Sequence, residues 1–339
     1  MTAQLPPIAE WQDVTPGSFA GEIVPRGAPA VLRGLVRDWP AVAESRGSGD
    51  AARAYLAGLD RGGPVEAFIA PAQAHGRYFY ADDMRGFNFE RHKGTIAEIL
   101  RFLGTIEGRD GAPSVYVGSA PIPEQMPDFA AANRLALLAG KPAIPRLWFG
   151  NESVVSPHFD LSDNIACVVA GRRRFTLFPP DQLANLYVGP LDHTMAGQPA
   201  SMVDLAAPDF DRYPRFREAL AAASAAELEP GDALYIPAMW WHQVEALAPF
   251  NALVNYWWDD APPDAGSPFE AMIHGIFAIA DLPPERRRIW RRMFDHYVFR
   301  EEGDPAAHLA PEHRGILAPS SPPLRARIRQ FLIRSLSRL

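Results

Sequence analysis

The chain has 339 residues, of which 47% are hydrophobic and 11% aromatic, so it can bury a sizeable core and does not resemble a disordered protein. Its net charge of −7 argues against nucleic-acid binding through a broad basic surface. No apolar run approaches roughly 18 residues, so we expect no membrane-spanning helix. The single cysteine, Cys167, excludes an internal disulfide. The first residues lack the basic and apolar regions of a signal peptide, so we expect a cytoplasmic protein.

The first third of the chain predicts loops, short strands and helices. Residues 1–50 are rich in proline and glycine, and they are expected to form loops with one or two short strands. The next expected elements are a helix over 50–59, strands over 65–70 and 77–80, and a helix over 96–103 that Thr95 caps. We assign residues 1–110 to an N-terminal α/β region that packs on the domain after it.

Short strands dominate the middle of the chain, which we assign to one domain over residues 111–262. The expected strands are 114–118, 147–149, 165–169, 174–178, 233–236 and 253–257. Helices are expected over 128–138 and 215–223, and the segment 187–214 is expected to be an insertion between strands. Many short strands separated by glycine and proline turns predict an antiparallel barrel or sandwich.

Helices are expected after Pro268, in a C-terminal region that we assign to residues 263–339. The last helix should begin at Pro322 with Ser321 as its N-cap. Its apolar residues form one stripe: Leu324, Ile328, Phe331, Leu332 and Leu339. The segment 322–339 also has five arginines and no acidic residue. Such a stripe must be buried, either on the protein's own barrel or against a second copy.

Two distant segments carry the residues with the clearest chemistry. Residues two apart in a strand face the same side, so His158 and Asp160 can bind one ion while Phe159 faces the opposite layer. Far downstream, an apolar strand leads into a proline-bounded loop that presents His242. Two imidazoles and one carboxylate form the facial triad that leaves positions on Fe(II) open for a co-substrate and O₂. Each segment alone is a weak signal, whereas the two together on neighbouring strands are specific.

The chain resembles the JmjC/cupin-like Fe(II)- and 2-oxoglutarate-dependent oxygenases. The segments that carry the resemblance are Leu147–Gly150, Ser156–Asp160, Gly171–Pro180 and Gly231–His242, together with Asn164. They are most similar to the hydroxylase branch that includes the hypoxia-inducible factor asparaginyl hydroxylase. The resemblance implies a mainly β fold with α elements. This fold is a double-stranded β-helix, or jelly roll, with N-terminal α/β decoration and C-terminal helices.

The resemblance implies three iron ligands and one residue that binds the co-substrate. The ligand positions of the family fall on His158, Asp160 and His242. The basic residue that binds the distal carboxylate of 2-oxoglutarate falls on Arg173, where the branch usually has lysine. Arginine can bind a carboxylate through two parallel hydrogen bonds. The arginines at positions 172 and 174 flank it and should face the other way if the strand is regular.

Four further polar residues are implied to line the co-substrate pocket. Tyr116 and Asn164 match positions that face 2-oxoglutarate, and Asn255 matches a polar position near the iron. The family often has Thr or Ser three residues before the first histidine. This chain has Val155 there, and we assign the role to Ser156. Without the resemblance, Tyr116 would be read as a core residue, while Asn164 could be a turn residue and Asn255 a core amide.

The resemblance implies Fe(II), 2-oxoglutarate and O₂, and it favours hydroxylation of a protein side chain. An oxygenase acting on a nucleoside or a small molecule stays open, as does a non-catalytic cupin-like binding or dimeric scaffold. The acidic net charge disfavours an RNA substrate, and no chromatin-reading module is present to favour a histone demethylase. Related hydroxylases dimerise through C-terminal helices, so we expect the apolar stripe of the last helix to form a homodimer.

Overall fold

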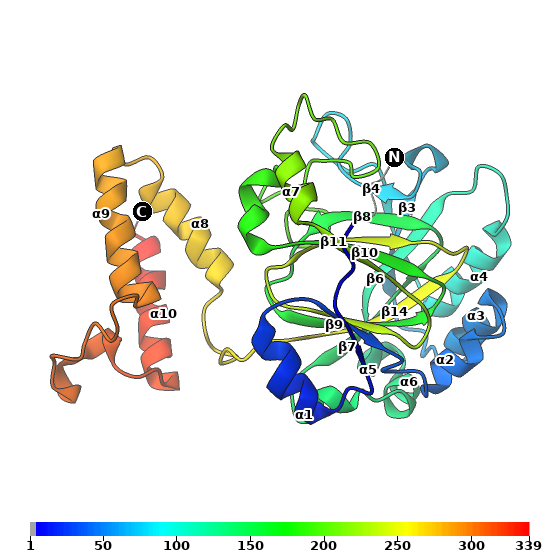
Figure 1. The fold of residues 1–339 in the computed structure, drawn as a ribbon, viewed down its shortest axis with the longest axis horizontal. Coiled ribbons are helices and arrows are strands. Elements are labelled where there is room, and N and C mark those ends of the chain that lie inside the picture. The colour runs from blue at the N-terminus through cyan, green and yellow to red at the C-terminus, as the bar shows by residue number, and fades with distance from the viewer. Residues whose placement is uncertain (1–4, 339) are drawn as a thin grey trace. The chain divides into compact units, whose positions relative to one another are not determined.

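The computed structural model describes residues 5–338, and the chain divides into two compact units, Met1–Asp259 and Asp260–Leu339. Within the described part of the chain, all named strands lie in the first unit and the second unit is helical (Figure 1). The boundary that we place at residue 110 inside the first unit stays a prediction. No helix among residues 5–338 is both long and apolar enough to span a membrane.

The strands of the first unit form a nine-stranded and a five-stranded sheet. Their bounds are β1 Glu10–Gln12, β2 Ala30–Arg33, β3 Val65–Ala70, β4 Arg77–Tyr78, β5 Glu90–Gly94, β6 Ser114–Pro121, β7 Ile144–Gly150, β8 Ser153–His158, β9 Asp163–Ala170, β10 Arg173–Phe178, β11 Ser224–Leu228, β12 Ala233–Ile236, β13 Trp241–Ala246 and β14 Asn251–Trp258. The larger sheet has the order β1-β2-β12-β9-β14-β7-β6-β3-β5, and the smaller has the order β11-β10-β13-β8-β4.

These two sheets confirm the predicted jelly roll. Strands β12, β9, β14 and β7 of the larger sheet face β11, β10, β13 and β8 of the smaller one (Figure 1). The strands of the N-terminal region extend the larger sheet at both edges, with β1 and β2 beside β12, and β3 and β5 beside β6, which itself pairs with β7. The N-terminal α/β region is therefore continuous with the barrel.

Ten α-helices accompany the strands in the described chain. Their bounds are α1 Pro16–Ser18, α2 Pro40–Ser45, α3 Gly49–Gly58, α4 Ile96–Ile106, α5 Ile122–Gln125, α6 Pro127–Ala132, α7 Phe216–Ala222, α8 Pro268–Ile279, α9 Pro284–Phe294 and α10 Pro322–Leu336. Side chains of α3, α4 and α6 belong to the core on the outer face of the larger sheet. These helices therefore leave the space between the two sheets to side chains of the strands.

Strand β9 shows why the middle of the chain reads as continuous apolar runs. Ile165 and Cys167 belong to the helix-covered core, whereas Ala166 and Val168 belong to the core between the two sheets. The strand is therefore buried on both faces, and both sets of alternating residues are apolar.

The predicted helix that Thr95 caps is confirmed, whereas the helix predicted over 128–138 is too long. Thr95 Oγ1 accepts from the Glu98 backbone N–H, and the Glu98 carboxylate accepts from the Thr95 N–H, which forms a capping box. The helix expected over 128–138 is wrong beyond Ala132, because Asn133 leaves helical geometry. Its amide accepts from Ala41 N–H at 3.0 Å and donates to the Phe129 carbonyl at 3.0 Å. The Asn133 backbone N–H also donates to the Phe129 carbonyl at 2.9 Å, so side chain and backbone together close the end of the helix.

Three strands were not expected from the sequence. One is β5 of the larger sheet, and the other two are β11 and β13 of the smaller sheet, which pair with β10 on its two sides. The expectation that a loop presents His242 is wrong, because His242 is the second residue of β13. Strand β8 also ends at His158, so Asp160 lies just beyond the strand rather than on it. The polar, buried centre of β13 hides its strand character, which appears only through pairing with its neighbours.

The C-terminal unit contains the helices expected after Pro268. Ser321 stands at the N-cap position of α10, but its side chain makes no capping hydrogen bond. Within the predicted stripe, Leu324 is buried while Phe331 and Leu332 are exposed. Leu339 lies outside the described residues.

Candidate metal centre and co-substrate cavity

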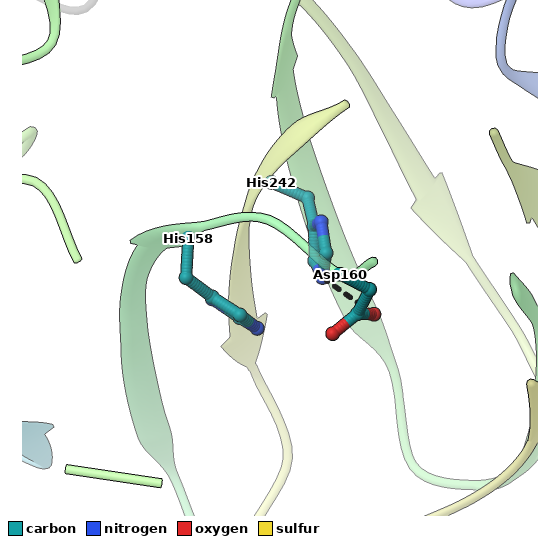
Figure 2. Close-up of side chains that lie close together, drawn as sticks. All are labelled: His158, Asp160 and His242. Atoms are coloured by element: carbon teal, nitrogen blue, oxygen red, sulfur yellow. Dashed lines mark ion pairs between the residues drawn. The ribbon is translucent and has the colours of Figure 1, made fainter. Parts of the chain in front are cut away.

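Strands β8 and β13 bring together the three residues that the sequence proposes as metal ligands. His158 and His242 are direct cross-strand partners, and their ring centroids are 4.3 Å apart. Asp160 follows β8 and turns its carboxylate toward both rings (Figure 2). One ligand atom from each of the three residues lies within 4.8 Å of the others. The three side chains therefore offer a compact set of two nitrogens and one oxygen.

Backbone carbonyls fix the orientation of both imidazole rings. His158 Nδ1 lies 2.9 Å from the Ser156 carbonyl, and His242 Nδ1 lies 3.1 Å from the Trp240 carbonyl. A carbonyl oxygen only accepts, so in each ring Nδ1 carries the hydrogen and donates it. The lone pair of each Nε2 is therefore available to a metal ion, which is the arrangement expected of metal-binding histidines.

The Asp160 carboxylate is oriented by two side-chain donors. Its Oδ2 accepts from Asn164 Nδ2 at 3.1 Å and from the Trp257 indole N–H at 2.9 Å. No described residue donates to Oδ1. The carboxylate is thus held at one oxygen and keeps the other for a ligand.

A chain of hydrogen bonds extends this support through the larger sheet. Trp148 Nε1 donates to Asn255 Oδ1 at 2.6 Å, and Asn255 Nδ2 donates to Asn164 Oδ1 at 3.2 Å. Each donor fixes which way the next amide points, until Asn164 donates to Asp160. Since Asn164 and Asn255 are buried, this chain holds the carboxylate in one geometry.

His242 is in an environment that keeps its ring neutral. Burial lowers the pKa of His242, and the neighbouring His158 ring lowers it further, while Asp160 opposes the shift. A neutral imidazole is the form that binds a metal ion. The donor set and its protonation therefore fit a divalent transition metal such as Fe(II).

The metal centre opens into a cavity of about 440 Å³ between the two sheets. All eight predicted site residues line it: Tyr116, Ser156, His158, Asp160, Asn164, Arg173, His242 and Asn255. Residues of the predicted insertion, Met195 and Gln198 among them, also contribute to its wall. The fold thus brings the eight residues into one site, and their roles stay predictions.

Arg173 is the most unusual residue of this cavity. Its side chain is buried, yet Nε and Nη2 have no hydrogen-bond partner among the described residues. Burial lowers the pKa of the Arg173 guanidinium, and the nearby Tyr116 phenol opposes that shift. The flanking Arg172 and Arg174 are exposed and lie near Glu227, so they face the other way as predicted. Nε and Nη2 form the edge of the guanidinium that binds a carboxylate through two parallel hydrogen bonds.

Two hydroxyl groups share the cavity with Arg173. Burial raises the pKa of Tyr116 to about 12, so its phenol stays a neutral hydrogen-bond donor. Ser156 Oγ is buried and has no partner within the described chain. Strand β8 has one more residue than β13 between their paired positions, and Val155 and Ser156 both line the cavity beside this bulge. These unpartnered donors and the guanidinium fit a bound carboxylate.

Sequence reasoning missed Trp257, which donates directly to Asp160. The residue lies two positions after Asn255 on β14, and both line the cavity. Residues two apart in a strand face the same side, so placing Asn255 in the pocket could have predicted that Trp257 also faces it.

The jelly roll, with two histidines and one aspartate in its cavity, defines a cupin-like protein with a candidate metal centre. The family model described as "Cupin-like domain" matches residues 16–264, which is most of the chain. The chain therefore belongs to the cupin-like JmjC family.

Three relatives illustrate the range of this family. The chain is 27% identical over 272 residues to the human "Bifunctional peptidase and (3S)-lysyl hydroxylase JMJD7", covering 72% of this chain and 81% of that protein. It is 33% identical to the Arabidopsis thaliana "Lysine-specific demethylase JMJ31" over 40% of this chain and 23% of that protein. It is 36% identical to the Gallus gallus "tRNA wybutosine-synthesizing protein 5" over 40% of this chain and 44% of that protein. The chain thus spans less than half the length of the latter two relatives.

Proposed function

We propose that the protein is an Fe(II)- and 2-oxoglutarate-dependent dioxygenase. The observation that carries the proposal is one cavity with a complete His-Asp-His ligand set and a buried guanidinium edge that lacks a partner. A scaffold that had lost its chemistry would have no need to keep an uncompensated charge buried, because such a charge costs stability. Family membership supports the same function.

In this proposal His158, Asp160 and His242 hold Fe(II). When bound, Fe(II) supplies the redox chemistry in which O₂ oxidises 2-oxoglutarate to succinate and CO₂ while the second oxygen atom enters a substrate C–H bond. The backbone carbonyls that bind the Nδ1 atoms keep both rings aimed at the metal. The donors Asn164 and Trp257 hold the Asp160 carboxylate in position.

Arg173 would bind the distal carboxylate of 2-oxoglutarate through its free Nε–Nη2 edge. Tyr116 and Ser156 are placed to donate hydrogen bonds to the same co-substrate, since both line the cavity and neither hydroxyl donates a hydrogen bond elsewhere within the described chain. Asn164 and Asn255 would fix the metal end of the co-substrate pocket through their hydrogen-bonded chain.

A protein side chain is the substrate class that we favour. The relative of which this chain covers 81% has lysyl hydroxylase in its name. Another relative is named for tRNA wybutosine synthesis, which keeps a nucleoside or small molecule as the second candidate. Mass spectrometry of proteins and of nucleosides after reaction separates the two, because each product gains one oxygen atom.

The direct test is turnover by purified protein supplied with Fe(II), ascorbate and 2-oxoglutarate in air. We expect succinate to form slowly without a substrate and faster with one, and we expect a chelator to stop the reaction. Protein that binds Fe(II) and 2-oxoglutarate but forms no succinate with any candidate would contradict the dioxygenase. Protein that binds neither would point to the scaffold.

A homodimer through the C-terminal helices, in the cytoplasm, completes the proposal. The second unit has large apolar side chains exposed on each of its α-helices: Phe277 is 68% exposed, Ile289 60% and Phe331 65%. Such surfaces support an interface with a second copy. Light scattering should give the mass of a dimer for the full chain and the mass of a monomer for a chain that ends at Pro319. A full chain that is monomeric at micromolar concentration overturns the dimer.

A further inference from the structure

A second arginine, Arg146, faces the same cavity and has no role in the proposed binding of iron or 2-oxoglutarate. It lies on β7, two residues before Trp148, and both side chains line the cavity. Its cross-strand partner on β14 is Asn255. Its guanidinium lies 5.9 Å from the centre of the Trp257 ring, whose indole N–H donates to Asp160. A single indole ring therefore contacts both Arg146 and the candidate metal centre.

A bulge in β6 holds this guanidinium in place. Arg146 Nη1 donates to the carbonyl of Ser119 at 3.1 Å and to its hydroxyl at 3.2 Å. Strand β6 has one more residue than β7 between their paired positions, and Ser119 has a φ of 60°. That conformation is costly for a residue other than glycine and persists where the surroundings enforce it. The two hydrogen bonds occupy Nη1 and leave the Nε–Nη2 edge free.

The balance of charges within the cavity indicates what the free edge of Arg146 could bind. Among the described residues, no carboxylate pairs with Arg146, and Asp160 is the only acidic residue that lines the cavity. Asp160 is committed to the metal, and Arg173 to the distal carboxylate of 2-oxoglutarate. The other carboxylate of the co-substrate lies at the metal in the proposed function. One positive charge, that of Arg146, then remains without a counter-charge in the loaded cavity.

We propose that Arg146 is a specificity-determining residue that binds a carboxylate of the primary substrate. The proposal rests on the proposed function and narrows its substrate class to peptides with an acidic residue close to the oxidised position. Its free Nε–Nη2 edge matches a planar carboxylate. An arginine fixed beforehand by Ser119 also loses little side-chain entropy when the substrate binds.

The test compares two small probes that differ in charge alone. N-acetylaspartate amide and N-acetylasparagine amide have nearly the same shape, and calorimetry can measure the binding of each to protein loaded with Fe(II) and saturating 2-oxoglutarate under anaerobic conditions. Saturating 2-oxoglutarate keeps Arg173 occupied. We expect the acid to bind roughly tenfold more tightly than the amide, as for hydrogen bonds to charged groups.

Three variants show whether Arg146 causes that difference. Arg146→Gln should bring the ratio close to one, and Arg146→Lys should retain part of it as a point charge. The control Arg101→Gln removes one charge from the exposed face of α4 and should keep the full ratio. Equal binding of the two probes by the wild-type protein, binding of neither, or a full ratio in Arg146→Gln overturns the proposal.

The outcome is independent of turnover. The protein could prefer the acidic probe through Arg146 and yet form no succinate. That result would support the carboxylate site and contradict the proposed dioxygenase activity. Succinate formation without any charge preference would support the dioxygenase and contradict the carboxylate site. If Arg146→Gln lowers the free energy of unfolding and leaves the ratio unchanged, the arginine serves only to hold the β6 bulge.

Discussion

The two ends of the cavity treat their charged groups in opposite ways. At one end, the Asp160 carboxylate accepts hydrogen bonds from Asn164 and Trp257, and a chain of amides supports it from behind. At the other end, the Arg173 guanidinium is more deeply buried than Asp160, but its Nε and Nη2 have no partner in the described chain. The protein thus supplies partners for the acid and leaves the base without them.

This difference indicates that Asp160 is positioned in advance for a metal, whereas Arg173 is kept free to bind a ligand. A carboxylate that must present one oxygen to a metal needs its other oxygen fixed, and the chain provides that fixation. A guanidinium that must bind an exchangeable dicarboxylate has to keep its donors free until the ligand arrives. The unpartnered end should therefore govern ligand affinity, and the partnered end should govern the geometry of the metal centre.

Removal of a metal ligand should have the largest effect. His158→Ala takes away one of the three ligand atoms, so we expect 2-oxoglutarate turnover to fall to the background without added metal. Succinate formation measures this loss directly. His308→Ala, an exposed histidine in the C-terminal unit, is the matched control and should keep full activity. Near-normal turnover by His158→Ala would refute the assignment of the metal ligands.

Truncation of Arg173 should come next. A buried charged pair that loses one partner costs roughly 2 to 5 kcal/mol, so Arg173→Ala should weaken 2-oxoglutarate binding by at least about tenfold. Anaerobic titration of both proteins measures the dissociation constant. Arg174→Ala removes an exposed arginine from the same strand and should leave the constant unchanged. An unchanged constant in Arg173→Ala would move the role to another cation, with Arg146 the first to examine because it lines the same cavity.

The sequence predicts those parts of the fold that depend on local patterns. The expected strands at 65–70 and 233–236 coincide with β3 and β12, because each is an apolar run between turn residues. Strand β13 was missed because its centre, His242 and Gln243, is both polar and buried. Only pairing with β10 and β8 makes this segment a strand, and such pairing is not visible in a local window.

The candidate site also has parts that the sequence predicts and parts that it does not. Of the eight predicted residues, His158, Asp160 and His242 follow from strand spacing and ligand type. The other five were named from a family pattern, since composition alone could not bring Arg173 next to Tyr116. The sequence pattern did not predict which polar atoms would find partners. The Trp257 bond to Asp160 and the Ser119 bond to Arg146 depend on side-chain direction across strands and on a bulge. Those details require three-dimensional packing.

Loss of one donor at the partnered end should have a smaller effect. Trp257→Phe removes the indole N–H from Asp160 while Asn164 still donates, so the carboxylate keeps part of its support. Changes around metal ligands typically lower metal affinity by roughly 10- to 100-fold, and we expect Fe(II) binding to weaken within that range. Trp39→Phe is the control, because its indole N–H donates to the Arg134 carbonyl outside the cavity. Equal Fe(II) affinity in both variants would show that Trp257 does not support the metal centre.

The smallest expected effect is on stability, and it has the opposite sign from the effect on binding. Arg173→Met replaces a buried group that lacks partners with an apolar side chain of similar length, so the ligand-free protein should gain about 1 to 3 kcal/mol in free energy of unfolding. A 2-oxoglutarate concentration that saturates the wild-type protein should stabilise it through mass action. The same concentration should stabilise the variant less, because the variant binds the co-substrate more weakly.

Urea denaturation with and without 2-oxoglutarate measures both responses. Arg174→Met is the control, because that arginine is exposed and points away from the cavity, so its stability should stay within about 0.5 kcal/mol of wild type and its response to 2-oxoglutarate should remain. A ligand-free Arg173→Met protein that is less stable than wild type would mean that the guanidinium already contributes to folding. The contrast between the two ends of the cavity would then fail, because both charged groups would be supported by the protein before any ligand binds.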